Sequence, residues 1–161
     1  MSTLQELSYT IGQDVTINLH GLPDGSKALS DVIDNSVTRF IQADIGFKFK
    51  TNIHGIDKNA SVVIGLLRSA DGGVTYDSNI RPGNILAVVD NLDKGTEYVL
   101  SVATNALGYL PAFFKISIRN STGAPFFHDA SHFGVWFTGK KVLEVTSTLS
   151  FGMAMGSEWL R

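Results

Sequence analysis

Val62-Val-Ile-Gly-Leu-Leu67 is the first of three apolar runs in the stretch from Ala60 to Ala106, and this stretch decides the fold. The other two runs are Ile85-Leu-Ala-Val-Val89 and Tyr98-Val-Leu-Ser-Val102. Runs of five or six aliphatic and β-branched residues, bounded by Asp, Gly and Asn, predict strands rather than helices. The stretch is therefore expected to form the middle of an antiparallel β domain.

The octapeptide Ser69-Ala-Asp-Gly-Gly-Val-Thr-Tyr76 lies between the first two runs. Asp71, Gly72 and Gly73 favour a tight hairpin there, because such turns need the positive φ angles that glycine adopts readily. The octapeptide resembles the Asp box of sialidases and several other β-proteins, which is Ser-x-Asp-x-Gly-x-Thr followed by an aromatic residue. Sialidases repeat the box on successive propeller blades, whereas this chain carries one copy.

The resemblance implies a structural role for the hairpin. Asp71 is expected to accept hydrogen bonds from backbone N–H groups of the turn, as Asp commonly does. Ser69 and Thr75 are expected to hydrogen-bond across the hairpin, and Tyr76 is expected to pack into the core beneath it. The predicted structural residues, none of them catalytic, are Ser69, Asp71, Gly72, Gly73, Thr75 and Tyr76.

Alternation of apolar and polar residues with a period of two runs through most of the chain. Such alternation is typical of half-buried strands, and it places Ile45, Phe47 and Phe49 on one face of a predicted strand. A short helical turn is expected only over 28–33. Together with the apolar runs, the alternating segments give about nine strands and predict one antiparallel β-sandwich spanning 1–161. These segments are 8–19, 41–53, 113–119, 133–138 and two more in the last twenty residues.

The composition limits the class of function. Charged residues are 17% of the chain and hydrophobic residues 43%. The usual charged share is about a quarter, so the deficit indicates surface that is hidden in an oligomer or against another subunit. The net charge of −2 and the pI near 6.0 argue against a nucleic-acid partner. The chain has no cysteine, which excludes disulfides and thiolate chemistry.

The first residues, Met1-Ser-Thr-Leu-Gln-Glu, lack the basic and apolar regions of a signal peptide. No apolar run approaches the roughly eighteen residues of a membrane span. We therefore expect a soluble protein that is made in a cytoplasm and has no membrane partner.

No group of residues predicts catalysis or a cofactor. His128 and His132 have Asp129 between them, but the spacing His-x-x-x-His places two metal ligands on one face only in a helix, and the flanks here are strand and loop. Aspartates are scattered at turns, and no pair stands out as the opposed carboxylates of a glycosidase. The sequence has no Gly-x-Ser-x-Gly elbow and no phosphate-binding loop. We expect no enzymatic activity, no metal and no cofactor.

Aromatic residues crowd into one quarter of the chain. One interpretation places all of them in the core. The other places Phe126, Phe127 and Trp136 outside it, with His128 beside them, as contacts to a partner subunit or a ligand, because contact surfaces are enriched in aromatic residues. Exposed aromatic residues also stack on sugar rings, which makes a carbohydrate the alternative partner. The crowded residues are Phe113, Phe114, Phe126, Phe127, Phe133, Trp136 and Phe137, with Trp136 expected on the opposite side of its strand from its neighbours.

The order of segments between Ile45 and Gly123 resembles the small jelly-roll cement, or decoration, proteins of tailed-bacteriophage capsids. An aliphatic strand, the Ser69-Ala-Asp-Gly-Gly73 hairpin, Leu92-Asp-Lys-Gly-Thr-Glu-Tyr-Val-Leu100 and Phe113-Phe-Lys-Ile-Ser-Ile-Arg-Asn-Ser-Thr-Gly123 follow one another in this order. The resemblance implies a jelly-roll-like sandwich and a homotrimer that clamps neighbouring subunits of the major capsid protein. It also implies extended terminal arms, here 1–13 and 147–161. The loop 125–132 departs from the family pattern.

The leading expectation is therefore a structural virion protein of the capsid surface, made in the host cytoplasm, which stabilises the shell by binding between capsid subunits. The alternative is a carbohydrate-binding or receptor-binding module of a phage tail or fibre.

Overall fold

The computed structural model describes residues 3–10 and 12–146 of the chain. This part of the chain forms ten strands and three short 3-10 turns. The strands are β1 (Thr3–Tyr9), β2 (Gln13–Asp14), β3 (Lys27–Leu29), β4 (Ile33–Asp34), β5 (Gln42–Lys50), β6 (Ser61–Arg68), β7 (Ile85–Val89), β8 (Glu97–Ala103), β9 (Phe113–Ser121) and β10 (Gly134–Thr146). The 3-10 turns are η1 (Pro82–Asn84), η2 (Thr104–Leu107) and η3 (Ala130–His132). The predicted all-β fold is confirmed.

Two predicted elements have other outcomes. The helical turn over 28–33 is wrong, because Lys27–Leu29 is strand β3, in which Ala28 pairs with Ile118 and is buried. A buried residue flanked by two exposed ones is a strand pattern, and three residues were too few to display it. The predicted last strand and the arm 147–161 lie outside the described residues.

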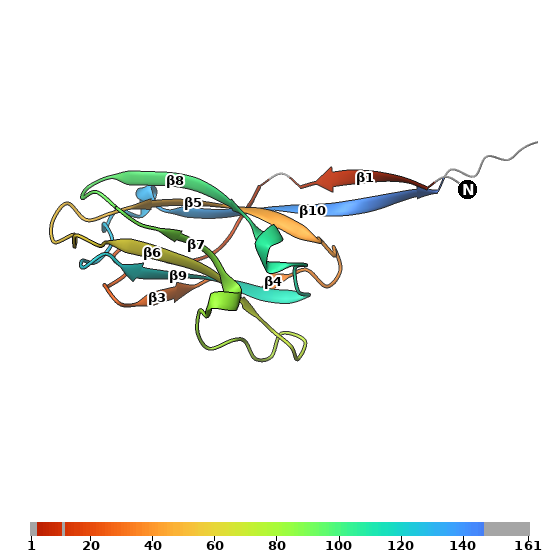
Figure 1. Cartoon of the computed structure of the whole chain (residues 1–161), viewed down its shortest axis with the longest axis horizontal. Coiled ribbons are helices and arrows are strands. Elements are labelled where there is room, and N and C mark those ends of the chain that lie inside the picture. Colours follow the sequence, from red (N-terminus) through yellow and green to blue (C-terminus); the bar gives the residue numbers. More distant parts are fainter. Residues whose placement is uncertain (1–2, 11, 147–161) are drawn as a thin grey trace, which may run out of the picture.

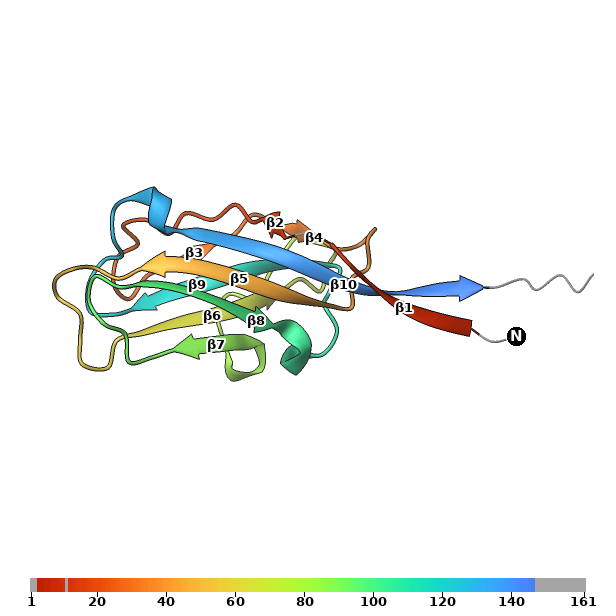
Figure 2. The ribbon, with the colours of Figure 1, turned by 90° about the horizontal axis from the view of Figure 1, so that it is seen from above.

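The strands form two antiparallel sheets that pack face to face (Figures 1 and 2). The first, called here the β5 sheet, has the order β1-β10-β5-β8, with β2 beside β10. The second, the β6 sheet, has the order β3-β9-β6-β7, with β4 beside β9. β8 and β7 are thus the outermost strands on one side of the sandwich.

The connectivity is that of a jelly roll. Strands from the two ends of the sequence pair first and the pairs then close inward along the chain: β1 and β2 pair with β10, β3 and β4 with β9, β5 with β8, and β6 with β7. Successive pairs belong to alternate sheets, which wraps a folded ribbon into a double sheet. The predicted jelly-roll-like sandwich is confirmed.

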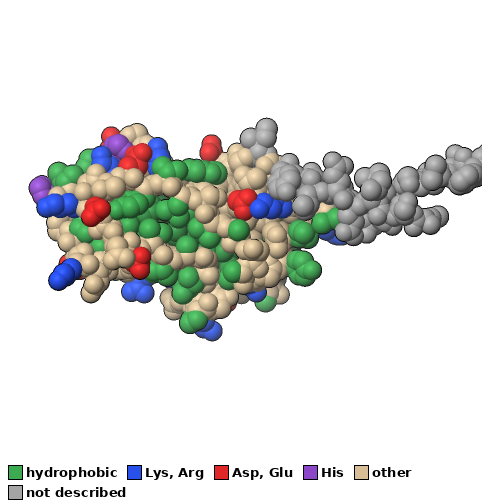
Figure 3. All heavy atoms as spheres, turned by 45° about the horizontal axis from the view of Figure 1, so that its top comes forward, with side chains coloured by type: hydrophobic (Ala, Val, Ile, Leu, Met, Phe, Trp, Pro, Cys, Tyr) green, Lys and Arg blue, Asp and Glu red, His purple; other side chains and the backbone are tan. Residues whose placement is uncertain are grey.

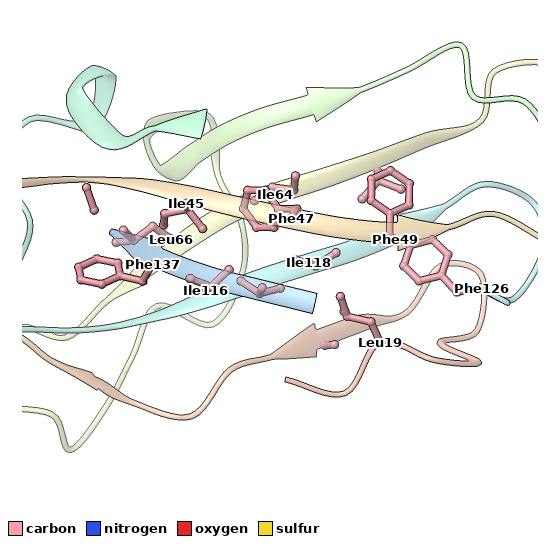
Figure 4. Packing of buried hydrophobic residues seen from close by; sticks show 14 of the residues in the cluster. Leu19, Ile45, Phe47, Phe49, Ile64, Leu66, Ile116, Ile118, Phe126 and Phe137 are labelled. Carbon is pink, nitrogen blue, oxygen red and sulfur yellow. The ribbon is translucent and has the colours of Figure 1, made fainter. Parts of the chain in front are cut away.

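The core lies between the two sheets and follows the alternation in the sequence (Figure 4). Ile45, Phe47 and Phe49 of β5 point inward, as predicted, and are almost fully buried. They meet the inward faces of β6, β9 and β10, where Phe137 packs edge-on against Phe40 with ring centroids 5.6 Å apart. The other buried strand residues of the core are Ala43, Val62, Ile64, Leu66, Phe114, Ile116, Ile118 and Val135.

β10 is longer than its neighbours, and this gives the molecule its elongated shape. Its first part, Gly134 to Lys140, pairs with β5. Among the described residues, its second part pairs only with β1, in a register that joins Tyr9 to Lys140 and Thr3 to Thr146. The two strands therefore leave the sandwich together as a two-stranded ribbon, called here the β1–β10 ribbon (Figures 1 and 2).

Candidate interaction surfaces

Within residues 3–10 and 12–146, the β1–β10 ribbon has unpaired backbone along both edges. Beyond Lys140, no third strand among the described residues pairs with either β1 or β10. An edge strand presents a row of free N–H and C=O groups to which another strand can add, and a two-stranded ribbon by itself is at best marginally stable in water. The ribbon is therefore a surface on which a strand of another chain can dock.

The side of the sandwich formed by β7 and β8 is a second open surface. Val88 of β7 is 53% exposed and faces outward from the β6 sheet beside Val63. Val99 of β8 is 63% exposed and faces outward from the β5 sheet beside Lys48. Inward-facing Leu86, Leu100 and Val102 are only partly buried, because no further strand follows in either sheet of the described structure. Figure 3 looks obliquely onto this side and shows hydrophobic side chains gathered across the middle of the body. We call it the β7–β8 side.

β7 also lacks the features with which soluble proteins usually protect an edge strand. Its sequence Ile85-Leu-Ala-Val-Val89 contains no charged residue and no proline. Edges left this apolar promote association, and contiguous exposed apolar surface commonly marks a site of contact with another protein. The β7–β8 side thus has the chemistry of a protein contact.

The octapeptide forms a compact loop around the Asp71 carboxylate. Oδ1 accepts hydrogen bonds from Val74 N–H at 3.2 Å, Thr75 N–H at 2.8 Å and the Ser69 hydroxyl at 2.8 Å, while Oδ2 accepts from the Thr75 hydroxyl at 2.6 Å. The Ser69 oxygen in turn accepts from Gly73 N–H at 2.8 Å. These bonds, that from the Thr75 hydroxyl foremost, lower the pKa of Asp71 to about 2. The predicted hydrogen bonds from turn N–H groups to Asp71 are confirmed. The Ser69 and Thr75 hydroxyl groups both donate to the same carboxylate.

The loop itself differs from the predicted tight hairpin. Gly72 and Gly73 have positive φ angles, as predicted, but residues 69–84 all lie between β6 and β7. The longer loop folds over the outer face of the β6 sheet and covers Leu67, which faces outward there and is only 1% exposed. A hairpin of two residues would leave this leucine in water, and the sequence gives no local sign of which face Leu67 occupies.

Tyr76 is not in the core. It is half-buried, and its ring lies under the Lys115 ammonium group, with Nζ 4.8 Å from the ring centroid. Lys115 faces outward on β9, because its neighbours Phe114 and Ile116 face the core. The prediction for Tyr76 is therefore wrong: the loop carries it onto the outside of the β6 sheet.

The prediction of Phe126 as a partner contact is wrong, because the structure buries its side chain in the core. It is 0% exposed, and its ring lies between those of Phe49 and Phe133, with centroids 5.8 and 5.9 Å away. The backbone holds it there through hydrogen bonds of Phe126 N–H to Leu22 O and of Phe127 N–H to Lys50 O. In an extended segment successive side chains point to opposite sides, so Phe126 turns inward and Phe127 outward.

Phe127 lies at the rim of the β5 sheet, within a polar cluster. Lys50 Nζ is 4.4 Å from the Phe127 ring centroid, and the His132 ring packs against its edge at 5.4 Å. His132 Nδ1 lies 2.6 Å from a carboxylate oxygen of Glu97, and this bond is the main reason why the pKa of Glu97 is lowered. Together with a 2.6 Å bond from Lys48 Nζ to Ser131 O, the cluster fixes the loop after Phe127 across β5 and β8.

His128 is exposed and lies apart from this cluster. Its ring packs against Gly21, where a Cβ would come within 2.7 Å of Nδ1. His132 lies instead on Glu97, so the two histidines have different partners. No three His, Asp or Glu side chains within the described ranges are grouped in a way that could hold a metal ion.

Trp136 lies on the outer face of the β5 sheet, opposite Val135 and Phe137, as predicted. In the sheet register, Trp136 of β10 pairs with Gly46 of β5, and Gly46 pairs on its other side with Ser101 of β8. The indole occupies the space directly above Gly46, where a Cβ would overlap its five-membered ring. The sequence gives no sign of this pairing, because Trp136 and Gly46 are distant in the chain and the register alone brings them together.

A hollow of about 700 Å³ lies between the start of β3 and the loop 69–84. It is lined by Gly25, Ser26, Lys27, Asn79, Ile80 and Arg119, with no Asp, Glu or His among them.

The described helical turns are all too short and polar to cross a membrane. Comparison with models of known protein families and with curated protein sequences gives no match for this chain.

Proposed function

We propose that this chain is a structural, non-enzymatic protein of a virion: a cement or decoration subunit that lies on the capsid surface and stabilises the shell by binding between capsid subunits. The observation that carries the proposal is the β1–β10 ribbon, which extends from the sandwich with both backbone edges unpaired within the described structure (Figure 1). Such a ribbon becomes stable by adding to a strand of a neighbouring subunit.

The β7–β8 side supports contact between copies of this chain. Val88 and the partly buried Leu86, Leu100 and Val102 lie along this open side, and a second copy that covers it removes their apolar surface from water. The low charge fraction of 17% agrees with such hidden surface. We propose a homotrimer on this basis and on the resemblance to capsid cement proteins, with the major capsid protein as the second partner and neither nucleic acid nor membrane.

A trimer would present three β1–β10 ribbons to the shell at once. Linked weak contacts bind far more tightly than any one of them, because the second and third contacts form within an already bound complex. Binding between capsid subunits then resists their separation. In this assignment the protein is made in the host cytoplasm and acts on the assembled capsid.

The test uses the full chain and shells isolated from the same source. Analytical ultracentrifugation of the free protein should give the mass of three chains, and the protein should sediment with the shells. A variant that lacks residues 1–9, and hence β1, should remain folded but lose sedimentation with the shells. A monomer that does not bind shells under any salt condition contradicts the proposal.

A further inference from the structure

We propose that the outer face of the β5 sheet binds a carbohydrate chain, with Trp136 and Phe127 as the two side chains on which its sugar rings stack. The proposal does not depend on the capsid function, since it concerns the outer face of the β5 sheet, where Val99 lies beside Lys48, and neither the β1–β10 ribbon nor the open edge along β7.

Trp136 forms a flat platform. Its indole lies directly over Gly46, and two more glycines border it: Cβ atoms at Gly134 and Gly12 would lie 3.7 Å from Cζ3 and 3.4 Å from Cδ1. On the far side of Gly46 the next residue in register is the small Ser101. The Nε1, Cε2 and Cζ2 atoms of the indole cover Gly46, and this protects the backbone of β5. Trp136 is half-buried, so part of the indole is open to solvent.

Phe127 lies on the same face of the sheet. Gly46, Lys48 and Lys50 alternate with the inward residues of β5, so all three face outward. Trp136 covers Gly46 and Phe127 lies under Lys50. Four residues of strand separate these positions, or about 13 Å at 3.3 Å per residue. The two rings are therefore spaced along β5 with Lys48 between them.

The surroundings of these rings are mostly polar, with the exposed Val99 beside Lys48. Lys140 Nζ lies 2.7 Å from the Asp44 carboxylate at one end of the row, and Glu97 and Lys48 lie toward the other. A sugar ring has a flat face of C–H bonds, which is attracted to the electron-rich face of an aromatic ring, and a rim of hydroxyl groups that need donors and acceptors. An aromatic platform with charged and hydroxyl side chains around it fits both requirements.

The same chemistry disfavours a protein partner on this face. The buried centre of a protein interface is depleted in charged residues, whereas charged residues here stand between and beside the two rings. The apolar β7–β8 side has the composition expected of a protein contact instead. We therefore assign the two surfaces to different partners.

The test is a titration of the full, ¹⁵N-labelled chain with cellohexaose, maltohexaose, chitohexaose and laminarihexaose, followed through the indole N–H signals. At least one hexasaccharide should shift the indole signal of Trp136, which the Trp136→Phe variant identifies by its absence. Trp136→Phe and Phe127→Ala should each raise the Kd by about tenfold, the loss of one stacking contact. Val88→Thr, on the β7–β8 side, should leave the Kd unchanged.

Two results would overturn the proposal: no hexasaccharide moves the Trp136 signal, or neither aromatic substitution changes the Kd. Trp136→Phe keeps a ring over Gly46, and thermal melts will show whether it folds. Should it not fold, Phe127→Ala decides, because Phe127 lies at the rim and outside the core. Sedimentation of Trp136→Phe with shells should match that of the parent, so failure here is distinguishable from failure of the capsid proposal.

Discussion

Ile80 fills the space that Gly65 leaves on the outer face of β6. A Cβ at Gly65 would lie 2.9 Å from Ile80 Cγ1 and 3.1 Å from the Asn84 carbonyl oxygen. The loop 69–84 is thus held on the β6 sheet by a side chain that fits a glycine, in addition to the hydrogen bonds around Asp71. This contact makes the loop a packed part of the structure and leads to the first prediction.

Gly65→Val should loosen the loop 69–84. The added methyl groups force Ile80 and the backbone at Asn84 away, and overpacking of this kind costs about 1–3 kcal/mol. Urea unfolding should show the lower free energy of unfolding, and limited proteolysis should show earlier cleavage within 69–84. Gly83→Ala is the matched control, because a Cβ there meets nothing within 4 Å. Equal stability of the Gly65 and Gly83 variants would mean that Ile80 does not anchor the loop.

Asp71 should contribute to stability in a defined pH range. Its pKa is about 2 in the folded protein and 3.8 in the absence of its partners. Because the folded value is the lower one, the contribution is full above pH 3.8 and is lost as the pH falls toward 2. Asp71→Asn should therefore lower the Tm by a few degrees at neutral pH and flatten the decline of Tm between pH 4 and pH 2.

The control for this prediction is Asp90→Asn, since the Asp90 carboxylate is exposed and makes no hydrogen bond with the described residues. It should leave the profile of Tm against pH as in the parent. A profile for Asp71→Asn that runs parallel to the parent through the whole acid range would contradict the role of the carboxylate.

The adjacent residues Phe126 and Phe127 should respond very differently to truncation. Phe126→Ala opens a cavity between Phe49 and Phe133 and should cost about 3–5 kcal/mol of unfolding free energy. Phe127→Ala removes a half-buried ring at the rim and should cost far less. Urea unfolding of both variants gives the comparison. Equal losses would place both rings in the core.

Val88→Lys should dissociate the oligomer that we propose. A charge in the centre of an apolar contact must be desolvated without a partner, which costs several kcal/mol at each copy of the interface. Ultracentrifugation should show a folded monomer. Val37→Lys is the control, because Val37 is 88% exposed but lies in the turn before Phe40, away from the β7–β8 side. A Val88→Lys variant with the parent's mass would remove that side from the interface.

The sandwich itself was predictable because its cause is local. In β5 and β9, apolar residues at every second position leave only one face that can be buried, and the structure buries that face. The bonds to Asp71 were predictable for the same reason, as they join residues within one short motif.

The remaining features depend on register and on side chains distant in the sequence. The loop 69–84 was expected to be a tight turn because nothing near it reveals that Leu67 faces outward and needs cover. Phe126 and Phe127 are alike as residues, and only the pairing of their backbone with Leu22 and Lys50 decides which one enters the core. Trp136 acquires its position over Gly46 from the pairing of β10 with β5, which no single segment encodes.

The position of β10 has a consequence for biosynthesis. This strand lies between β2 and β5 in its sheet, yet it is the last of the described strands to leave the ribosome. Until Gly134 and its successors emerge, β5 lacks one neighbour and the inner face of its sheet stays open to water. Folding is therefore completed after synthesis of β10, through contacts between the two ends of the chain, and such non-local pairing is slow. The nascent protein should depend on chaperones for as long as this gap persists.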